Sequence, residues 1–467
     1  TNFFKTLIVG GFNLVSCYPS FPDGRLILTH IAELRIFLSH NKLAKLRDFM
    51  KKLFTLFIFA LLYLFSLSIA SHGSAGSLSI NEDKDRVIVF PDTKNYKTIV
   101  ADLHTHSVFS DGHVWPNIRV EEALRDGLDA LAITEHLEYQ PHYQDIPHKD
   151  RNRSYEEAKA AASGKKIIII SGSEITRDMP PGHINAVFIK DANKLFNIDL
   201  PKNDKEKEIL SEKIREMQWG ADEETKKHYI LANMWPAEKA VEAANQQGAF
   251  LFWNHPDWYR QAPDGIARLQ LMHKKMIDKG YLHGIEVVNG NGYSAEAFQI
   301  AIDNNLAVIG TSDVHDLIDW DYKPYAGGHR PVTLVFARSK NANSIKQALE
   351  ERRTVVWFKN RLIGLKENLI PLINSSLSTG SATYSDETTI ARFTIKNSSD
   401  VTFLLKNLSD YSFNNSDDLV EVPAQGTKYV QVKTLEKVGV LNIGFEVLNA
   451  LVGPNENAKI NLKIRIN

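Results

Sequence analysis

The sequence predicts an α/β fold followed by a small all-β domain, and three observations lead to this prediction. Short apolar runs rich in β-branched residues alternate with longer polar segments over residues 98–336. Several of these polar segments have the periodicity of amphipathic helices. After about residue 376 the texture changes, and apolar and polar residues alternate one by one. The length of 467 residues is sufficient for roughly two to three domains.

The apolar runs have the composition of strands that are buried on both faces of a parallel sheet. They comprise residues 98–103, 128–134, 166–172, 184–190, 248–253, 284–289, 306–311 and 332–337. Helices are predicted over 120–126, over 237–247 with Pro236 at the start, and over 294–304. Because strands alternate with helices, the sequence predicts a parallel sheet covered by helices.

The segment from about 191 to 235 interrupts this alternation and is rich in Lys and Glu. We predict a helical insertion whose charged residues form a solvated face. Its aromatic residues Trp219, Tyr229 and Trp235 have two interpretations. They either line a substrate cleft or fix the insertion to the sheet.

The last part of the chain, about 376–467, is predicted to be a small β-sandwich. Residues 391–396 and 459–466 alternate between apolar and polar side chains, as half-buried antiparallel strands do. This part contains no histidine, so we expect it to contribute nothing to a metal site. A packing or attachment role is the expected one.

The N-terminal part contains a segment that is typical of a secretory signal peptide, predicted over 50–75. Met50 and two lysines precede an apolar run over 53–70, and small residues follow. An uncleaved membrane anchor is the alternative, since the run has about the length of a span. Cleavage near Ala70 or Ala75 would leave no stable membrane span. Residues 1–49 are expected to be a non-native upstream segment, and the mature protein is expected to be secreted to the periplasm.

Composition limits the partners and the metal chemistry. The net charge is -1, from 55 basic and 56 acidic residues, so no global field attracts nucleic acid. No basic patch interleaved with aromatic residues is present either, and we expect no specific nucleic-acid partner. With 16 histidines and one cysteine, Cys17, any metal site depends on imidazole and carboxylate ligands. Such ligands favour Zn, Mn or Fe over metals that prefer sulfur.

Histidines and carboxylates gather where the predicted strands end. The residues are His104, His106, Asp111, His136, Glu174, His183, His255, Asp313 and His315. In parallel β/α barrels the carboxyl ends of the strands converge on one face, so these side chains are expected to meet. His183 precedes its strand and is expected to need a loop that folds back over that face. Each motif alone is a weak signal, but the joint pattern indicates cations, which would neutralise the clustered carboxylates.

The motifs DLHTHSVFSDG, ITEH, SGSE, GHIN, WNHP and TSDVH, in this order over about 98–336, carry a family resemblance. The chain resembles the PHP family, named for polymerase and histidinol phosphatase domains. The resemblance implies a distorted (β/α)7 TIM-like barrel over about 90–360. It also implies two to three divalent metal ions (Zn, Mn or Fe) and the hydrolysis of phosphoesters.

The resemblance also implies how the ligands are divided among the metals. The first metal takes His104, His106, Glu174 and Asp313, the second takes Asp111, His136 and His315, and the third takes Glu174, His183 and His255. His113 is a less favoured substitute for Asp111. Glu135 stands where the family often has Asp, and it is expected to act behind the ligands.

The expected mechanism follows from the charge of the metals. A water between cations loses a proton near neutral pH, and the resulting hydroxide attacks phosphorus in line. Asp111 and Glu174 are therefore counted as catalytic residues. Arg177, His329 and Arg330 are expected to grip the phosphate at the barrel mouth, with ion pairing and loop structure as their alternative roles.

The leading hypothesis is an exported metal-dependent phosphoesterase that hydrolyses small phosphorylated substrates, either phosphomonoesters or phosphodiesters. The alternative is a non-catalytic, metal-containing protein that binds an envelope component or a glycan. A nuclease is less favoured. The sequence does not distinguish monoesters from diesters and gives no oligomeric state.

Overall fold

The computed structural model describes residues 86–196, 201–385 and 387–467. The predicted upstream segment 1–49 and the predicted signal peptide 50–75 lie outside the described residues. Within the three described ranges, no helix is both long and apolar enough to cross a membrane. All of the predicted site residues fall within these ranges.

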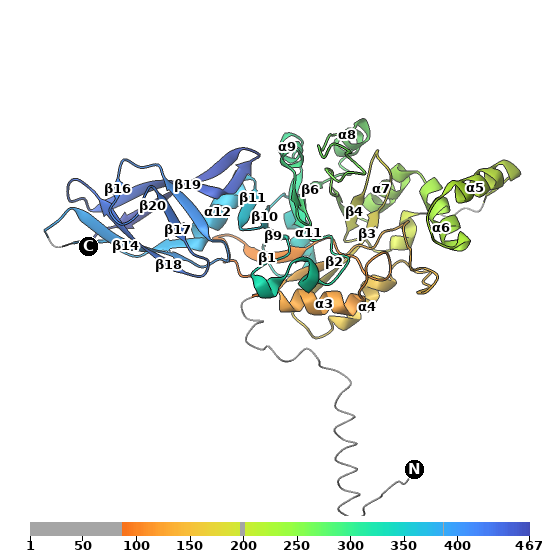
Figure 1. The fold of residues 1–467 in the computed structure, drawn as a ribbon, viewed down its shortest axis with the longest axis horizontal. Helices are drawn as coiled ribbons and strands as arrows, with labels where there is room; N and C mark the ends of the chain where they lie inside the picture. Colours follow the sequence, from red (N-terminus) through yellow and green to blue (C-terminus); the bar gives the residue numbers. More distant parts are fainter. Residues whose placement is uncertain (1–85, 197–200, 386) are drawn as a thin grey trace, which may run out of the picture. The chain divides into compact units, whose positions relative to one another are not determined.

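The α/β part, called the barrel part below, is built on a mixed sheet whose strands are mostly parallel in its central region (Figure 1). These strands are β1 (Lys97–Asp102), β2 (Ala130–Ile133), β3 (Ile168–Ile175), β4 (Ile184–Val187), β5 (Phe250–Trp253), β6 (Gly284–Asn289) and β8 (Ala307–Thr311). Parallel pairing joins β1 to β2, β2 to β3, β5 to β6 and β6 to β8. All residues of β2, β4, β5 and β8 are buried, as their continuous apolar sequences require. The predicted α/β fold class is confirmed.

Strand β4 differs from the prediction because it runs antiparallel to both neighbours, β3 and β5. The connection from β3 to β4 consists of residues 176–183. A parallel neighbour would need a crossover of roughly a dozen or more residues, so this short connection allows only an antiparallel strand. The start of β4 therefore lies at the same edge of the sheet as the end of β3.

Further strands extend the sheet beyond β1. They are β9 (Val332–Ala337), β10 (Thr354–Phe358) and β11 (Arg361–Gly364), and they pair antiparallel to one another and to β1. An isolated parallel bridge joins Thr105, which follows β1, to Val314, which follows β8. This bridge brings the ends of the first and last parallel strands together.

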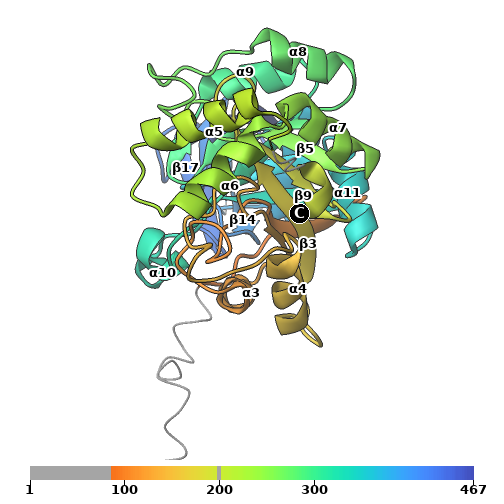
Figure 2. The same ribbon diagram turned by 90° about the vertical axis from the view of Figure 1, so that its right-hand side faces the viewer.

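Helices connect and cover the strands (Figures 1 and 2). They are α3 (Pro116–Arg125), α4 (Arg153–Ala161), α7 (Ala237–Gln246), α8 (Leu271–Asp278), α9 (Ala295–Asp303) and α11 (Ala342–Glu350). The predicted helix at 237–247 matches α7, with Pro236 at its N-cap. The predicted helix at 294–304 matches α9, where the Ser294 side chain accepts a hydrogen bond from the Ala297 amide as an N-cap. The predicted helix at 120–126 begins earlier, because Pro116 is compatible with a first helical turn.

The insertion contains η2 (Ala192–Leu195), α5 (Asp204–Glu216) and α6 (Glu223–Met234). Helices α5 and α6 lie side by side in both ribbon views (Figures 1 and 2). Each helix begins at a polar N-cap, Asn203 in α5 and Asp222 in α6. The pair has a small core of its own, formed by Leu210, Ile230 and Leu231. Shorter elements of the barrel part are β7 (Gly292–Tyr293), α10 (Ile318–Asp321) and η3 (Pro324–Ala326).

The C-terminal part forms two antiparallel groups of strands. One group contains β12 (Leu377–Thr379), β13 (Thr383–Tyr384), β14 (Ile390–Asn397), β16 (Ser412–Phe413) and β18 (Thr427–Lys433). The other contains β15 (Phe403–Asn407), β17 (Leu419–Val422), β19 (Val440–Gly453) and β20 (Glu456–Arg465). Burial alternates residue by residue along β14 and β20, so the period-two pattern of the sequence places one face of each strand in the core.

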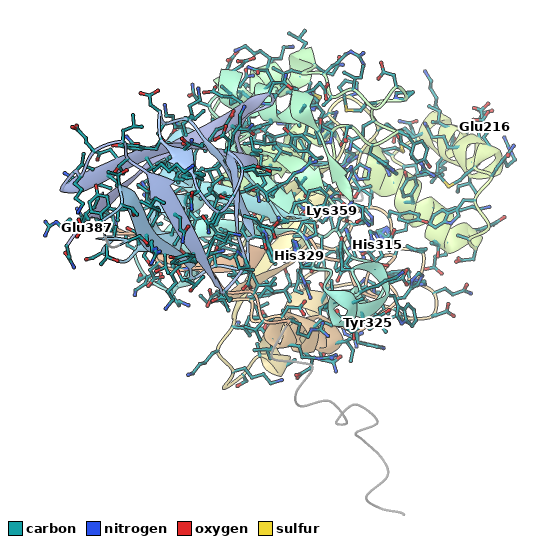
Figure 3. The ribbon with its side chains drawn as sticks, turned by 60° about the vertical axis from the view of Figure 1, so that its left-hand side comes forward. Glu216, His315, Tyr325, His329, Lys359 and Glu387 are labelled. Carbon is teal, nitrogen blue, oxygen red and sulfur yellow. The ribbon has the colours of Figure 1, made fainter. Side chains whose placement is uncertain are left out.

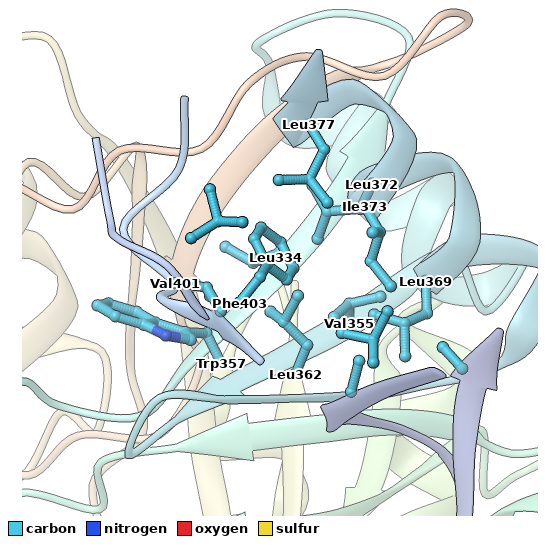
Figure 4. Packing of buried hydrophobic residues seen from close by; sticks show 14 of the residues in the cluster. Leu334, Val355, Trp357, Leu362, Leu369, Leu372, Ile373, Leu377, Val401 and Phe403 are labelled. Atoms are coloured by element: carbon cyan, nitrogen blue, oxygen red, sulfur yellow. The ribbon is translucent and has the colours of Figure 1, made fainter. Parts of the chain in front are cut away.

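The barrel part and the C-terminal part share one hydrophobic core. Strand β11 pairs in parallel with β19, so the second C-terminal group continues the sheet of the barrel part. Helix α12 (Lys366–Ser376) packs between them, and Figure 4 shows Leu369 and Leu372 of this helix close to Val355, Leu362 and Phe403. All of these side chains are fully buried.

Candidate metal centre

The predicted ligands come together at the edge of the sheet where the parallel strands end. His104 and His106 follow β1, His136 follows β2, His255 follows β5, and Asp313 and His315 follow β8. Glu174 is near the end of β3, and Asp111 lies in the loop before α3. Eight of the nine predicted ligands, all except His255, fall into three overlapping groups whose ligand atoms are close enough to hold a metal ion.

The first group contains His104, His106 and Asp313. The Nε2 atoms of the two imidazoles are 3.0 Å apart. Each of these nitrogens is 3.1 Å from Oδ1 of Asp313. Both histidines are almost completely buried, so their Nε2 atoms face one another in a site without solvent.

The second group is centred on Asp111, with His106, His136 and His315 around it. Oδ1 of Asp111 is 3.1 Å from Nε2 of His315 and 3.4 Å from Nε2 of His136. His113 does not take part, since its side chain is 61% exposed and its Nδ1 is 2.6 Å from Asp316. The structure thus brings Asp111, and not His113, to this group.

Glu174 connects all the groups. Its Oε1 is 3.1 Å from Nδ1 of His183, 3.2 Å from Nε2 of His255 and 3.6 Å from Nε2 of His104. Its Oε2 is 2.5 Å from Nδ1 of His136. The carboxylate is fully buried, and it lies where a ligand shared between neighbouring cations would be.

The position of His183 is explained by the direction of β4. This histidine precedes β4, and the antiparallel course of β4 places its start beside the end of β3. The loop that we expected to return His183 to this face is the short connection of residues 176–183 between the antiparallel strands β3 and β4.

Two ligands sit on strained backbone. His255 and Asp313 have positive φ angles of 29° and 50°. Asp and His are among the non-glycine residues that tolerate this left-handed region best. Such strain is concentrated at functional sites, where the surrounding structure maintains it.

Hydrogen bonds on the far side of the imidazole rings fix which nitrogen is free to bind a cation. Nδ1 of His104 lies 2.9 Å from Oε1 of Glu286, and Nδ1 of His315 lies 2.8 Å from the carbonyl oxygen of Asp313. Since these oxygens only accept, both Nδ1 atoms donate, and in the neutral rings both Nε2 atoms carry lone pairs. Nδ1 of His106 contacts the Ser110 hydroxyl, which donates to Glu135.

The donor set fits divalent cations. The facing Nε2 lone pairs of His104 and His106 would repel one another without a positive charge between them. Within the described part of the chain, the buried atoms Asp111 Oδ1 and Glu174 Oε2 lie close to imidazole nitrogens, but none of these contacts has the geometry of a hydrogen bond. Buried polar atoms without partners are costly, and a cation satisfies them. Imidazole and carboxylate donors are those preferred by Zn, Mn and Fe.

Charge within the cluster shifts the pKa values of its members. Burial disfavours the charged form of His104, but Asp313, Glu286 and Glu174 outweigh burial and raise its pKa well above the usual value. The pKa of His315 is likewise raised to about 9, because Asp111 and Asp313 outweigh the effect of burial. Burial raises the pKa of Glu174, but the surrounding histidines lower it further, to well below its usual value. The carboxylates in this cluster are therefore ionised, and nearby positive charge stabilises them.

Sequence reasoning missed residues that hold the ligands in place. Glu286, on β6, contacts His104 and also accepts hydrogen bonds from the Thr311 hydroxyl (2.6 Å) and the His255 amide (2.7 Å). Asn254 donates to Glu174 (2.7 Å), and Asn289 donates to Asp313 (3.1 Å). A carboxylate inside the apolar run GIEVVN is a signal that could have identified Glu286, since a buried charge requires a partner.

Glu135 lies behind the ligands, as the sequence analysis expected. Its Oε2 accepts hydrogen bonds from the Ser107 amide (3.0 Å) and the Ser110 hydroxyl (2.5 Å). These bonds order the loop that carries His106 and Asp111.

The structure does not place Arg330 or His329 at the mouth of the barrel, and the expectation that they grip phosphate there is corrected. Arg330 is 1% exposed and forms ion pairs with Asp126 (2.6 Å) and Asp102 (3.3 Å). The ring of His329 stacks on Trp357 with centroids 3.5 Å apart (Figure 3 labels His329 and His315). Neither side chain lines the cavity at the metal centre.

Arg177 does line that cavity, but its guanidinium is held by the protein. Nη2 of Arg177 is 2.8 Å from Oε1 of Glu138, and Nη1 donates to the Asn233 carbonyl oxygen (2.9 Å). Glu138 is buried, so releasing Arg177 to a phosphate would leave an uncompensated buried carboxylate. The contacts favour the ion-pairing role for Arg177.

A cavity of about 740 Å³ opens above the centre. Among the ligands, Asp111, His136, His183, His255, Asp313 and His315 line it. Aromatic side chains form much of the remaining surface, and they are Tyr139, Trp219, Tyr229 and Trp258. The centre is therefore accessible to a small molecule.

Comparisons with known proteins agree with this geometry. A family model for the PHP domain matches residues 102–314, and a model for an Ig-like domain matches residues 377–463. A two-domain protein from Bacteroides vulgatus, described as containing a predicted PHP-like metal-dependent phosphoesterase, is 35% identical to this chain. The match covers 81% of this chain and 98% of that protein, with a TM-score of 0.69.

The chain belongs to the PHP family. More distant solved structures include PsfC from Pseudomonas syringae, with 18% identity over 56% of this chain and 92% of that chain. A lesion-specific endonuclease from Pyrococcus furiosus is 16% identical over 59% of this chain and 60% of that chain. Their TM-scores are 0.35 and 0.30. A comparison with curated proteins finds no match.

Proposed function

We propose that this PHP-family protein is a metal-dependent phosphoesterase that hydrolyses small phosphomonoesters or phosphodiesters at a centre of two to three divalent metal ions. The observation that carries the proposal is the position of Glu174. Its carboxylate is buried and lies within 3.7 Å of imidazole nitrogens of His104, His106, His136, His183 and His255. One carboxylate among so many imidazoles is expected where neighbouring cations share a ligand.

The residues divide among the metals in the way that the family resemblance implies. The first metal would take His104, His106, Glu174 and Asp313, the second Asp111, His136 and His315, and the third Glu174, His183 and His255. When bound, the cations supply positive charge that acidifies water and neutralises phosphate oxygens. Zn, Mn and Fe all suit these ligands.

The protein's own residues position the reaction. Asn254 and Asn289 donate hydrogen bonds to Glu174 and Asp313, which fixes the orientation of two carboxylates that would otherwise rotate. The cations and the phosphate would be held at the floor of the cavity, where the ligands are buried. Phosphoryl transfer depends mainly on such positioning and on electrostatic stabilisation.

The test uses p-nitrophenyl phosphate and bis-p-nitrophenyl phosphate with the purified protein. We expect hydrolysis of at least one ester, loss of activity with a chelator, and recovery when Mn²⁺ or Zn²⁺ is restored. Elemental analysis should give two to three metal equivalents. Glu174→Gln should lower both the metal content and the activity, whereas a Trp320→Ala variant, altered at an exposed residue, should lower neither. Activity that is indifferent to chelation and to Glu174→Gln would refute the proposal.

A metal-containing protein without catalytic activity is the alternative outcome. Tight binding of metals without turnover of a broad panel of phosphoesters would favour it.

Export is a separate part of the proposal. It is supported by the basic start, apolar run and small residues over 50–75. Expression of the full chain in a Gram-negative host should yield a protein in the periplasm that begins near residue 71 or 76. A protein that stays in the cytoplasm with this segment intact would contradict export.

A further inference from the structure

One wall of the cavity is made of three aromatic rings in mutual contact, with one pair tilted and two pairs edge-to-face. We call Tyr139, Trp219 and Tyr229 the aromatic wall. The ring centroids of Tyr139 and Trp219 are 5.1 Å apart, those of Trp219 and Tyr229 are 5.8 Å apart, and those of Tyr139 and Tyr229 are 6.1 Å apart. All three rings line the cavity. The wall therefore presents an apolar surface to whatever enters.

The aromatic wall begins beside the metal centre. The Tyr139 ring is 5.8 Å from the ring of His136, and Tyr139 follows that ligand by three residues. Trp219, in the connection between α5 and α6, contacts the Tyr139 ring and lines the same cavity. Both rings therefore face the space that a group attached to a phosphate at the centre would occupy.

Packing of the insertion does not explain Trp219. The α5–α6 pair has its own core of Leu210, Ile230 and Leu231, and Tyr229 packs against this core. Trp219 does not belong to it. Trp235, in contrast, packs against the core of the barrel part and does not line the cavity. Trp219 therefore agrees with the interpretation that these aromatic residues line a substrate cleft. Trp235 agrees with the interpretation that they fix the insertion to the sheet.

On the basis of the proposed function, we propose that the insertion selects phosphate esters whose alcohol carries a flat ring, which stacks on Trp219. Large aromatic faces left partly exposed inside a cavity gain most from a flat partner, because the contact buries apolar area on both sides. A flexible alkyl chain offers less flat area and loses more rotamer entropy when it is held there.

The ring could be aromatic, or it could be the apolar face of a sugar. Polar side chains of the cavity suit hydroxyl groups, since Asp257 and Gln218 can both accept hydrogen bonds. Trp258, whose ring is 5.2 Å from that of His255, provides a further aromatic face on the cavity surface. Both kinds of ring share the stacking chemistry, and the experiment separates them.

Binding is measured first, with the metal-loaded protein and non-hydrolysable phosphonates. Phenylphosphonate and methylphosphonate differ by the ring and have the same anionic group. We expect wild-type protein to bind phenylphosphonate about tenfold more tightly, which corresponds to one aromatic contact. Trp219→Ala should abolish this difference and Trp219→Phe should keep most of it. The exposed Trp320, on α10, gives the matched control Trp320→Ala, which should bind like wild type.

Hydrolysis is measured next, with esters of similar leaving-group chemistry. Benzyl phosphate is compared with butyl phosphate, and glucose 6-phosphate with glycerol 3-phosphate. We expect wild type to prefer the ring in at least one pair through KM, and Trp219→Ala to remove that preference while the kcat for the non-ring ester stays within about twofold. A preference confined to the first pair identifies an aromatic ring, and one confined to the second identifies a sugar.

The outcomes separate this inference from the proposed function. If wild type hydrolyses none of the four esters and none of the nitrophenyl esters, the proposed function fails. If it hydrolyses ring and non-ring esters equally, and Trp219→Ala changes neither binding nor KM, the function stands and the inference fails. Metal content and circular dichroism of each variant establish that the comparison uses folded, loaded protein.

Discussion

Glu286 fixes the ring of His104 from the side opposite the other ligands. Because its Oε1 accepts from Nδ1 of His104, the Nε2 lone pair points into the centre. Its Oε2 accepts from the His255 amide and from Asn289, so a single carboxylate orients several parts of the site. At this scale, the proposed metal centre depends on residues that would never touch a substrate.

We expect Glu286→Gln to weaken metal binding about 10- to 100-fold, since an amide accepts from His104 less strongly than a carboxylate. A competition titration with a chromophoric chelator measures the affinity. Glu296→Gln, altered at an exposed position on α9, is the matched control and should bind like wild type. Unchanged affinity in a folded Glu286→Gln protein would show that the His104 ring is oriented by something else.

Because burial shifts the pKa of His329, we expect the free energy of unfolding to depend on pH. Burial lowers the pKa of this imidazole to about 4, although its bond to the Arg330 carbonyl oxygen acts in the other direction. The unfolded chain binds its proton nearer pH 6.5, so stability is full above that pH and is lost as the pH falls towards 4. A shift of this size is worth at most about 3 kcal/mol.

The variant His329→Phe keeps a ring on Trp357 and cannot be protonated. Between pH 6.5 and 4, its free energy of unfolding should fall less steeply than that of wild type in urea denaturation. Parallel curves for the two proteins would contradict this assignment.

The clustering of the candidate ligands could be predicted from the sequence, but the ion-pair partners of Arg330 could not. Each ligand follows or begins a short apolar strand, and the geometry of a sheet brings such ends together. From the sequence alone, Arg330 could equally be a phosphate-binding residue or a member of a buried ion pair. Those partners, Asp126 and Asp102, are more than 200 positions away in the chain, and no local spacing connects them to it.

At the scale of the elements, β8 and β10 approach each other closely at Gly310. A side chain at Gly310 of β8 would place its Cβ 2.3 Å from Cγ1 of Val356 on β10. The absence of a side chain at Gly310 allows this approach, which supports the strand that ends in Asp313 and His315.

Gly310→Ala should therefore lower the free energy of unfolding by about 1–3 kcal/mol through overpacking. Thermal unfolding measures the change. At Gly439 a new Cβ would meet nothing within 4 Å, so Gly439→Ala is the matched control. Equal melting temperatures for the two variants would mean that β10 can move away from β8 at little cost.

Element type was predicted well where periodicity was strong, and strand direction less well. The helices α7 and α9 and the alternating strands β14 and β20 lie close to their predicted ranges. The predicted direction of β4 was wrong, because the apolar pattern of a buried strand is the same in either direction. Only the length of the connection before it carried that information.

At the scale of the whole molecule, the barrel part and the C-terminal part share a core. Phe403 of β15 is fully buried in the same cluster as Leu334, Trp357 and Leu369. This continuity indicates that the two parts stabilise each other. A packing or attachment role for the C-terminal part stays a prediction.

All tryptophans precede residue 358, so they lie in the barrel part and the insertion, and Trp357 also reports on the core shared with the C-terminal part. We expect Phe403→Ala, although located in the C-terminal part, to shift the fluorescence midpoint in urea. The loss should be about 3–5 kcal/mol, as for other large core truncations. A fluorescence midpoint equal to that of wild type, while far-ultraviolet circular dichroism shows early loss of strand signal, would mean that the parts unfold independently.

The α5–α6 pair carries a core of its own and contributes no metal ligand. It can therefore be replaced, as a cassette, by a pair of helices with a different residue at position 219 while the strand ends keep their geometry. The substrate preference could then be changed by grafting this one surface segment. The arrangement of histidines and carboxylates at the strand ends would stay unchanged.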